Sequence, residues 1–241
     1  MADFVQLWVY LSSTPLFGLT ATLGVYVLAH AFYTRMAQAP WANPVLWSVV
    51  LLALGLAATG TAYPTYFSGA QFIHFLLGPA VVALAWPLWQ RRAVLRQRGW
   101  VFVLAALIGG VAAAGSAVVL GWALGLPSEV LRSLAPKSIT APVAMGVADQ
   151  IGGIAALAAV FAVVTGLIGA LSGKYVFDAL GIGRDATGWM ARGFALGTAA
   201  HGIGAARALQ VHPDAGAWAA LALGLQAVVA SLVIPLVAAW F

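Results

Sequence analysis

The chain has 241 residues, of which 63% are hydrophobic and 7% are charged, and its mean hydropathy is +0.99. Soluble domains carry about a quarter charged residues, so this composition excludes a soluble globular protein and predicts an integral membrane protein. The formal net charge of +5 does not indicate nucleic-acid binding, because much of it lies in one short segment. Cysteine is absent, which excludes disulfides and thiolate metal sites.

Apolar runs recur along the chain, each close to the roughly 20 residues that cross about 30 Å of hydrocarbon. In chain order they are Pro15–Tyr33, Pro44–Ala58, Phe72–Trp89, Trp100–Leu126, Ile154–Leu171, Trp189–Leu209 and Ala215–Phe241. With an interrupted segment at Pro127–Ala148, they predict seven or eight membrane elements in an all-α, polytopic helical bundle. No polar stretch is long enough for a soluble domain, so we expect residues 1–241 to form a single membrane domain. The N-terminal MADF lacks the basic region of a cleavable signal peptide, so the first helix is expected to remain in the mature protein.

The basic segment QRRAVLRQR, residues 90–98, lies between two apolar runs and is interpreted as a loop. Its arginines are Arg91, Arg92, Arg96 and Arg98. By the positive-inside tendency, this segment faces the cytoplasm. Arg35, Lys174 and Arg184 fall on the same side if the first span enters from outside and the segment around Ser138 does not fully cross. The N-terminus would then be external and the C-terminus cytoplasmic.

The two halves of the chain resemble each other. Aligning Pro15 with Pro136 sets LSSTPLFGLTATLG beside RSLAPKSITAPVAM, with small and hydroxyl residues around each proline. Internal repeats are common in secondary transporters, whose sites lie near the membrane midplane where broken helices meet. We therefore interpret residues 1–125 and 126–241 as two structural repeats within one domain, in inverted or parallel orientation.

Polar residues and prolines interrupt the apolar sequence at Ala135–Met145, APKSITAPVAM. Pro136 and Pro142 remove backbone hydrogen bonds and hydrocarbon offers no replacement, so this segment must line a polar cavity or be buried in protein. The residues between the prolines that could bind a substrate are Lys137, Ser138 and Thr140. We expect a broken or re-entrant helix here, in which Lys137 receives a carboxylate. Alternatively, the lysine snorkels to the headgroups and the two hydroxyls only cap the freed backbone.

A second interruption, GFALGTAAHGIGAARALQ, covers Gly193–Gln210. Thr198 and His201 share a helical face, and imidazole titrates near neutrality, so we expect substrate hydrogen bonding or proton coupling here. The alternative for His201 is a buried histidine whose hydrogen bonds join two helices. Arg207 could pair with a substrate carboxylate or mark the helix end. The glycines expected to break this helix or pack it closely against a neighbour are Gly193, Gly197, Gly202 and Gly204.

Other residues are candidates for lining the same cavity or for breaking a helix. The cavity candidates are Asn43, Tyr66, His74, Asp149 and Gln150. Gly78 and Pro79 are expected to break the third apolar run. A core histidine is the favoured interpretation of His74. Asp149 could coordinate Na⁺ or carry a proton, although a solvated helix end is the favoured interpretation.

No catalytic triad, metal cluster or Walker loop is recognisable in the sequence, so we expect no enzymatic activity and no cofactor. Without an ATP site, any transport would have to be secondary or facilitated. A proton or Na⁺ is the expected coupling ion.

Six segments resemble the LrgB/CidB family in order and spacing over nearly the whole chain. They are NPVL, YFSGAQ, LLGPAVVALAWPLW, SLAPKSITAPVAMGV, IGG and ARGFALGTAAHGIGAARAL. That family was named for antiholin-like or holin-like effects on murein hydrolase activity and autolysis, and its members are usually paired with a small LrgA/CidA membrane partner. Its plastid relative is a glycolate/glycerate transporter. One departure is Ala205, where the family is expected to favour threonine.

The resemblance implies export or exchange of small monocarboxylates such as glycolate, glycerate or pyruvate across the bacterial cytoplasmic (inner) membrane. It also implies, more distantly, the crossed broken helices of cation–proton antiporters and bile-acid symporters. The leading hypothesis is therefore a carrier, and the rival is a regulator that acts on murein hydrolases. Expected partners are membrane lipid, the monocarboxylate, an LrgA/CidA-type protein and a second copy in a homodimer, but no nucleic acid.

Overall fold

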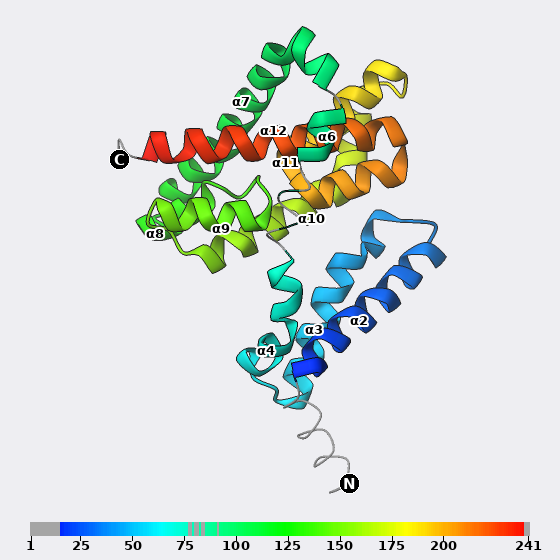
Figure 1. The fold of residues 1–241 in the computed structure, drawn as a ribbon, viewed down its shortest axis with the longest axis vertical. Coiled ribbons are helices and arrows are strands. Elements are labelled where there is room, and N and C mark those ends of the chain that lie inside the picture. The colour runs from blue at the N-terminus through cyan, green and yellow to red at the C-terminus, as the bar shows by residue number, and fades with distance from the viewer. Residues whose placement is uncertain (1–14, 77–78, 80–81, 83–84, 91, 239–241) are drawn as a thin grey trace, which may run out of the picture. The chain divides into compact units, whose positions relative to one another are not determined.

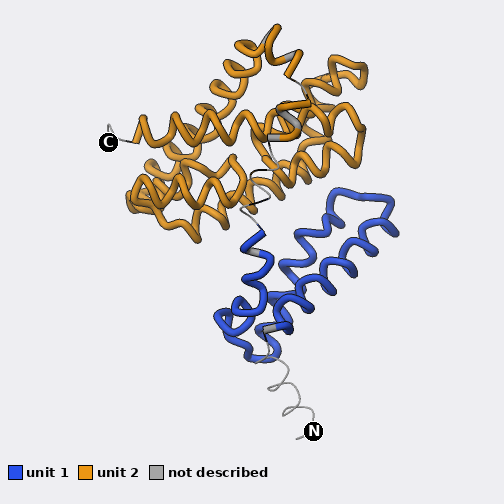
Figure 2. The backbone as a smooth tube through the Cα atoms, in the orientation of Figure 1, with its two compact units in different colours: residues 1–80 blue, residues 81–241 orange. Residues whose placement is uncertain are grey.

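The computed structural model describes residues 15–76, 79, 82, 85–90 and 92–238, and these residues form helices and connections without a strand (Figure 1). The predicted all-α class is confirmed. The chain divides into two compact units, residues 1–80 and 81–241, which are coloured separately in Figure 2. This division reflects which helices pack together, whereas the boundary proposed at residue 125 came from the similarity between the two halves of the sequence. The two repeats therefore stay a prediction.

In the first unit, α2 (Pro15–Arg35) packs against both α3 (Pro44–Thr59) and α4 (Tyr63–Phe75). A short 3₁₀ turn, Pro40–Ala42, leads into α3. The Asn43 side chain caps α3 by accepting hydrogen bonds from the first N–H groups, and Gly60, with φ of 64°, ends it in the left-handed conformation. Local residues thus set both ends of α3.

The second unit contains seven described helices. They are α6 (Ala85–Gln90), α7 (Arg92–Ala123), α8 (Ser128–Leu134), α9 (Ala141–Gln150), α10 (Ala155–Ala179), α11 (Ala186–Val211) and α12 (Pro213–Ala238). The α11–α12 pair has the most extensive packing, α10 packs against α11 and α9, and α7 packs against α12. The buried core includes Ile139, Ala144, Ala158, Ala162 and Ala230, so mostly small side chains let these helices approach closely.

Glycines set the spacing between α11 and α12. A Cβ at Gly193 would collide with the carbonyl oxygen of Ala215, and one at Gly197 with that of Ala219. Larger side chains at these positions would therefore push the helices apart. This close approach agrees with the packing role expected of the two glycines.

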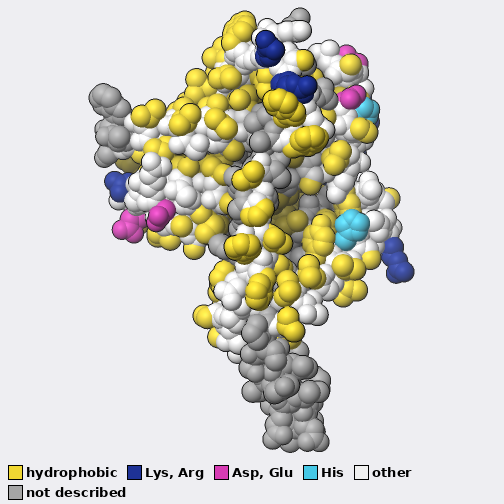
Figure 3. Space-filling view, viewed as in Figure 1, with side chains coloured by type: hydrophobic (Ala, Val, Ile, Leu, Met, Phe, Trp, Pro, Cys, Tyr) yellow, Lys and Arg dark blue, Asp and Glu magenta, His cyan; other side chains and the backbone are white. Residues whose placement is uncertain are grey.

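Four described helices are long and apolar enough to span a membrane: Leu16–Arg35, Gly99–Ala123, Ala155–Ala179 and Pro213–Ala238. Large apolar side chains such as Trp100, Val119 and Leu232 are exposed on these helices. Figure 3 shows hydrophobic side chains spread over the visible face, as expected of surfaces that meet lipid. The finer count of seven or eight membrane elements stays a prediction.

The interpretation of the basic segment as a loop is wrong. Arg92, Arg96 and Arg98 lie in the first two turns of α7, which continues without a break into the apolar span at Gly99–Ala123. Arginine, glutamine, leucine and alanine are all good helix formers, so the polar sequence extends the helix rather than ending it. Arg91 lies outside the described residues.

Candidate functional site

The first interruption separates two short helices. α8 ends at Leu134 and α9 begins at Ala141, and the connection between them turns twice through hydrogen bonds from Lys137 N to Leu134 O and from Ile139 N to Pro136 O. Pro142 is tolerated in the first turn of α9, where its missing N–H would have no intrahelical partner. The predicted break in this helix is confirmed.

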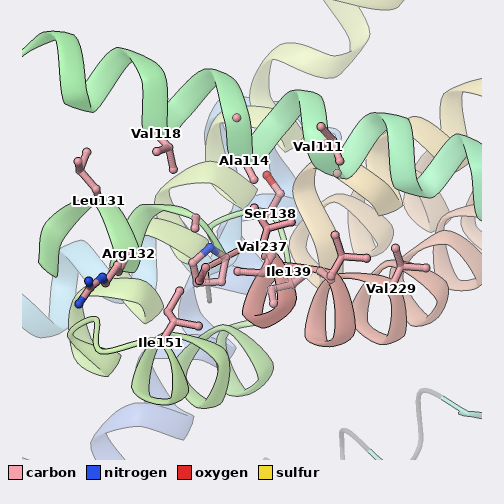
Figure 4. Close-up of a pocket in the computed structure, with 18 of the residues that line it drawn as sticks. Val111, Ala114, Val118, Leu131, Arg132, Ser138, Ile139, Ile151, Val229 and Val237 are labelled. Carbon is pink, nitrogen blue, oxygen red and sulfur yellow. The ribbon is translucent and has the colours of Figure 1, made fainter. Parts of the chain in front are cut away.

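This connection forms one wall of a cavity of about 650 Å³. α7 and α12 supply most of the other walls, and α8 and the end of α9 close one side (Figure 4). The labelled lining residues in Figure 4 include Val111, Ala114, Val118, Leu131, Ile139, Val229 and Val237. The lining is therefore mainly apolar, and its polar side chains are few: Ser128, Arg132, Ser138 and Gln226. Such a size and lining are typical of small-molecule sites.

Ser138 connects the predicted site to the cavity. Its side chain is 5% exposed and lines the cavity, where Figure 4 shows it pointing toward α7. The half-buried Lys137 donates a hydrogen bond from Nζ to Ser138 Oγ at 3.2 Å. Thr140 occupies the N-cap position of α9, yet its side chain makes no capping bond and its buried Oγ1 has no partner among the described residues. A cation, a hydroxyl and an open helix N-terminus thus lie within four consecutive residues.

The second interruption is a kink inside α11. His201 has φ of 41° and ψ of −132°, a conformation that is rare and strained for a residue other than glycine. Its ring is 4% exposed, and Nε2 lies 2.7 Å from the carbonyl oxygen of Ala162 on α10. Gly166 makes room for the ring, since a Cβ there would lie 2.8 Å from Cε1. His201 therefore joins α11 to α10 and is not among the residues that line the cavity.

Two further buried oxygens lack partners in the described part of the chain: Thr198 Oγ1 on α11 and Gln226 Oε1 on α12. Both side chains lie against neighbouring glycines of α7. A Cβ at Gly109 would lie 3.0 Å from the Thr198 methyl carbon, and one at Gly110 would collide with Gln226 Nε2. Gln226 also lines the cavity. Sequence reasoning missed it, although a lone amide in an otherwise apolar span is itself a signal of function.

Arg132 is a second lining residue that sequence reasoning missed. It is exposed, and its guanidinium lies near Gly152, where a Cβ would be 3.1 Å from one terminal nitrogen. Figure 4 shows its guanidinium at the edge of the pocket, pointing away from the other labelled lining residues. A cation at this edge favours the approach of anions.

The remaining predicted residues lie elsewhere. Arg207 is half-buried near the end of α11, and the exposed Asp149 and Gln150 end α9, and none of the three lines the cavity. In the first unit, Asn43 caps α3, and the Tyr66 hydroxyl lies 2.6 Å from Thr22 Oγ1. Among the residues expected to break helices, Pro136 lines the cavity, Gly204 is buried and Gly202 faces open space. Pro79 is exposed. Gly78 and the His74 side chain lie outside the described residues.

A buried arginine that sequence reasoning also missed closes the turn between α10 and α11. Arg192 pairs with Asp178 at 2.7 Å and donates to the carbonyl oxygens of Ile182 and Gly183. Its guanidinium also lies 5.6 Å from the centre of the Phe177 ring. These contacts fix the turn between α10 and α11, so we assign them a structural role. Among the described residues, no group of three or more His, Asp or Glu side chains could hold a metal ion.

Apolar helices of spanning length, two interrupted helices and a half-open apolar pocket between them are the features of a multi-pass α-helical membrane protein. The chain belongs to the LrgB-like family, which matches residues 22–240. It is 32% identical over 216 residues to the uncharacterized protein YxaC of Bacillus subtilis, covering 90% of this chain and 92% of that relative.

An uncharacterized protein of Haemophilus influenzae is 34% identical over 197 residues, which cover 81% of this chain and 83% of the relative. The holin-like protein CidB of Staphylococcus aureus is 31% identical over 209 residues, or 85% and 89% of the two chains. No solved structure matches this chain.

Proposed function

We propose that this protein is a secondary transporter of small monocarboxylates, of the glycolate, glycerate or pyruvate type. The observation that carries the proposal is the Lys137–Ser138 hydrogen bond in the connection before α9, where Ser138 lines a half-open apolar pocket and the half-buried Lys137 lies beside it. In such surroundings an ammonium is costly unless a partner or cavity receives it. A substrate carboxylate supplies that partner.

Three groups at or just before the start of α9 would favour binding of an anion. The ammonium of Lys137 provides a positive charge, Ser138 provides a hydroxyl donor, and Ala141 and Val143 provide the N–H groups of the first turn of α9, where Pro142 has none. Because Thr140 makes no capping bond, it leaves those N–H groups open to a ligand. The carboxylate would replace the Lys137–Ser138 hydrogen bond, in which only the donor is charged, with an ion-paired hydrogen bond to Lys137 and one from Ser138.

Alternating access requires elements that move against each other. The break between α8 and α9 and the kink at His201 are two described places in the second unit where backbone torsions can change without unwinding a regular helix. In the proposed cycle, movement at these points opens the cavity alternately to each side of the membrane.

Uptake of labelled glycolate and pyruvate by the purified protein in liposomes tests the proposal. Lys137→Ala is expected to lower the uptake rate at subsaturating substrate by about tenfold or more, because a charge-assisted hydrogen bond is lost. The control is Lys174→Ala, which removes the chain's other lysine from an exposed position. Equal uptake by the two variants would reject the role of Lys137.

A holin-like regulator of murein hydrolase activity and autolysis is the second candidate function, favoured by the name of the Staphylococcus aureus relative, "Holin-like protein CidB". Such a regulator would act with an LrgA/CidA-type partner. It predicts that the purified protein carries no substrate flux and that its effect on autolysis in cells requires that partner. Flux by the protein alone would favour the transporter.

A further inference from the structure

The half-open pocket of the second unit begins where α7 and α12 meet. The two helices touch at Gly110 and Gln226, where a Cβ on the glycine would collide with the glutamine amide. From this contact both helices continue along the pocket, α7 as far as Trp122 and α12 as far as Ala238. These twelve residues on each helix correspond to a rise of about 18 Å. The pocket is therefore about as deep as one lipid leaflet, which is half of the roughly 30 Å hydrocarbon core.

The face of α7 that lines the pocket is covered by protein in the preceding half of the helix. This face carries Phe102, Ala106 and Gly110 at four-residue steps. Ala106 is fully buried, and the Phe102 ring lies 5.4 Å from the ring of Trp218 on α12, centre to centre. The face is open only beyond Gly110. A partner's membrane helix packs along most of a span, so this short opening suits a single acyl chain better.

The pocket opens toward the hydrocarbon of the membrane. Its lining is mainly apolar, and four of its apolar side chains are more than half exposed: Val111, Val119, Trp122 and Val237. They belong to α7 and α12, which are both long and apolar enough to span a membrane. Exposed apolar side chains on such helices meet lipid, so lipid chains have direct access to the pocket.

Polar and amphipathic residues lie at one end of the pocket. Arg132 of α8 is exposed and makes no ion pair within the described part of the chain. Ser128 and Trp122 line the same end, and a tryptophan ring is typical of the headgroup layer. Glu129, on the same turn of α8 as Arg132, does not line the pocket. The guanidinium at the edge, outside the apolar lining in Figure 4, lies where the headgroup of a lipid would be if its chain were inside.

We propose that one phospholipid of the surrounding membrane binds here, with an acyl chain between α7 and α12 and its phosphate on Arg132. The chain gains little by leaving a bilayer as apolar as the pocket, so the charge-assisted hydrogen bonds between guanidinium and phosphate supply the preference for this site. The bound chain separates Ser138, on the opposite wall, from the bilayer. This inference does not depend on the proposed transport function, because Lys137 is not among the lining residues.

A substitution that fills the pocket tests the acyl chain. Gly115 lines the pocket, and a Cβ there meets no atom within 4 Å, so Gly115→Phe has room for its side chain. The matched control is Gly99→Phe on the same helix, where a Cβ also meets nothing within 4 Å and which does not line the pocket. Native mass spectrometry in detergent with added phosphatidylglycerol measures the bound lipid. We expect one tightly held lipid in the wild type and in Gly99→Phe, and about tenfold weaker binding or less in Gly115→Phe.

Arg132→Gln tests the phosphate contact. Phosphatidylglycerol and diacylglycerol with the same acyl chains differ only in the phosphate-bearing headgroup. The wild type should bind phosphatidylglycerol about tenfold more tightly, and Arg132→Gln should lose this preference. The control, Arg96→Gln, removes an exposed arginine near the opposite end of α7 and should keep the preference. Because Arg132 is exposed and has no ion pair among the described residues, its variant should melt at the wild-type temperature without added lipid.

Three results would overturn the inference. Equal binding of phosphatidylglycerol by Gly115→Phe and Gly99→Phe would mean that lipid coats the helices without entering the pocket. Equal binding of the two lipids by the wild type would remove the phosphate site. A wild-type dimer that holds no lipid and dissociates in Gly115→Phe would assign the pocket to a second copy of the chain. Lipid binding is measured without transport, so failure of monocarboxylate uptake leaves this inference standing.

Discussion

Two arginines contact the same carboxylate, Asp178, but differ in burial. The Arg192 side chain is 8% exposed and also donates to two backbone carbonyls, whereas the Arg184 side chain is 61% exposed. Replacing Arg192 with methionine removes its ion pair and its hydrogen bonds to both carbonyls and leaves Asp178 with only the exposed Arg184, so we expect a loss of about 2 kcal/mol in stability. Arg184→Met removes only a solvent-exposed ion pair and should change stability little. Thermal unfolding in detergent checks both variants, and equal melting temperatures would contradict the structural role of Arg192.

Individual polar residues were predictable from sequence where they formed a motif. Ser138 was identified because prolines and a lysine surround it, and the structure places it on the cavity wall. Gln226 stands alone in an apolar span, and its proximity to Gly110 exists only after α7 and α12 pack. His201 was expected to serve a substrate, yet it bonds to Ala162, because the kink at its own backbone changes the direction in which its side chain points. The buried-histidine alternative matches this geometry.

At the scale of elements, two glycines of α11 differ in their surroundings. A Cβ at Gly197 would collide with the Ala219 carbonyl oxygen, while one at Gly202 would meet nothing within 4 Å. Gly197→Ala must push α11 from α12 and is expected to lower stability by more than about 1 kcal/mol. Gly202→Ala fills open space and should be neutral or slightly stabilising, since alanine favours helix. Comparison of the two melting temperatures checks the prediction, and a more stable Gly197→Ala would refute the close packing.

Helix interruptions were the most predictable elements. Proline and closely spaced glycines signal them through local backbone chemistry, so the break before α9 and the disturbed α11 could be placed from sequence. Helix ends were less predictable. The arginine-rich segment before Gly99 is polar, so hydropathy alone predicts a loop. It contains no proline or glycine to stop a helix, and it forms the first turns of α7. The Phe72–Trp89 run was expected to break at Gly78 and Pro79; α4 ends at Phe75 and α6 begins at Ala85, and Gly78 lies outside the described residues.

At the scale of the whole molecule, the arrangement of the second unit constrains its orientation in the membrane. If α8 and α9 enter and leave the membrane on one side, the spans of α7 and α10 run in opposite directions. Arg96, near the start of α7, and Arg184, in the α10–α11 turn, then lie on the same side of the membrane. Figure 1 shows the start of α7 and the α10–α11 turn at the same end of the second unit. Both should face the cytoplasm because of the basic residues around them. The chain has no natural cysteine, so single substitutions Arg96→Cys, Arg184→Cys and Leu124→Cys can be labelled with an impermeant maleimide in inside-out and right-side-out vesicles. Arg96→Cys and Arg184→Cys should react in inside-out vesicles, and Leu124→Cys should react in right-side-out vesicles. Labelling of Arg96→Cys and Arg184→Cys from opposite sides would mean that α8 and α9 together cross the membrane.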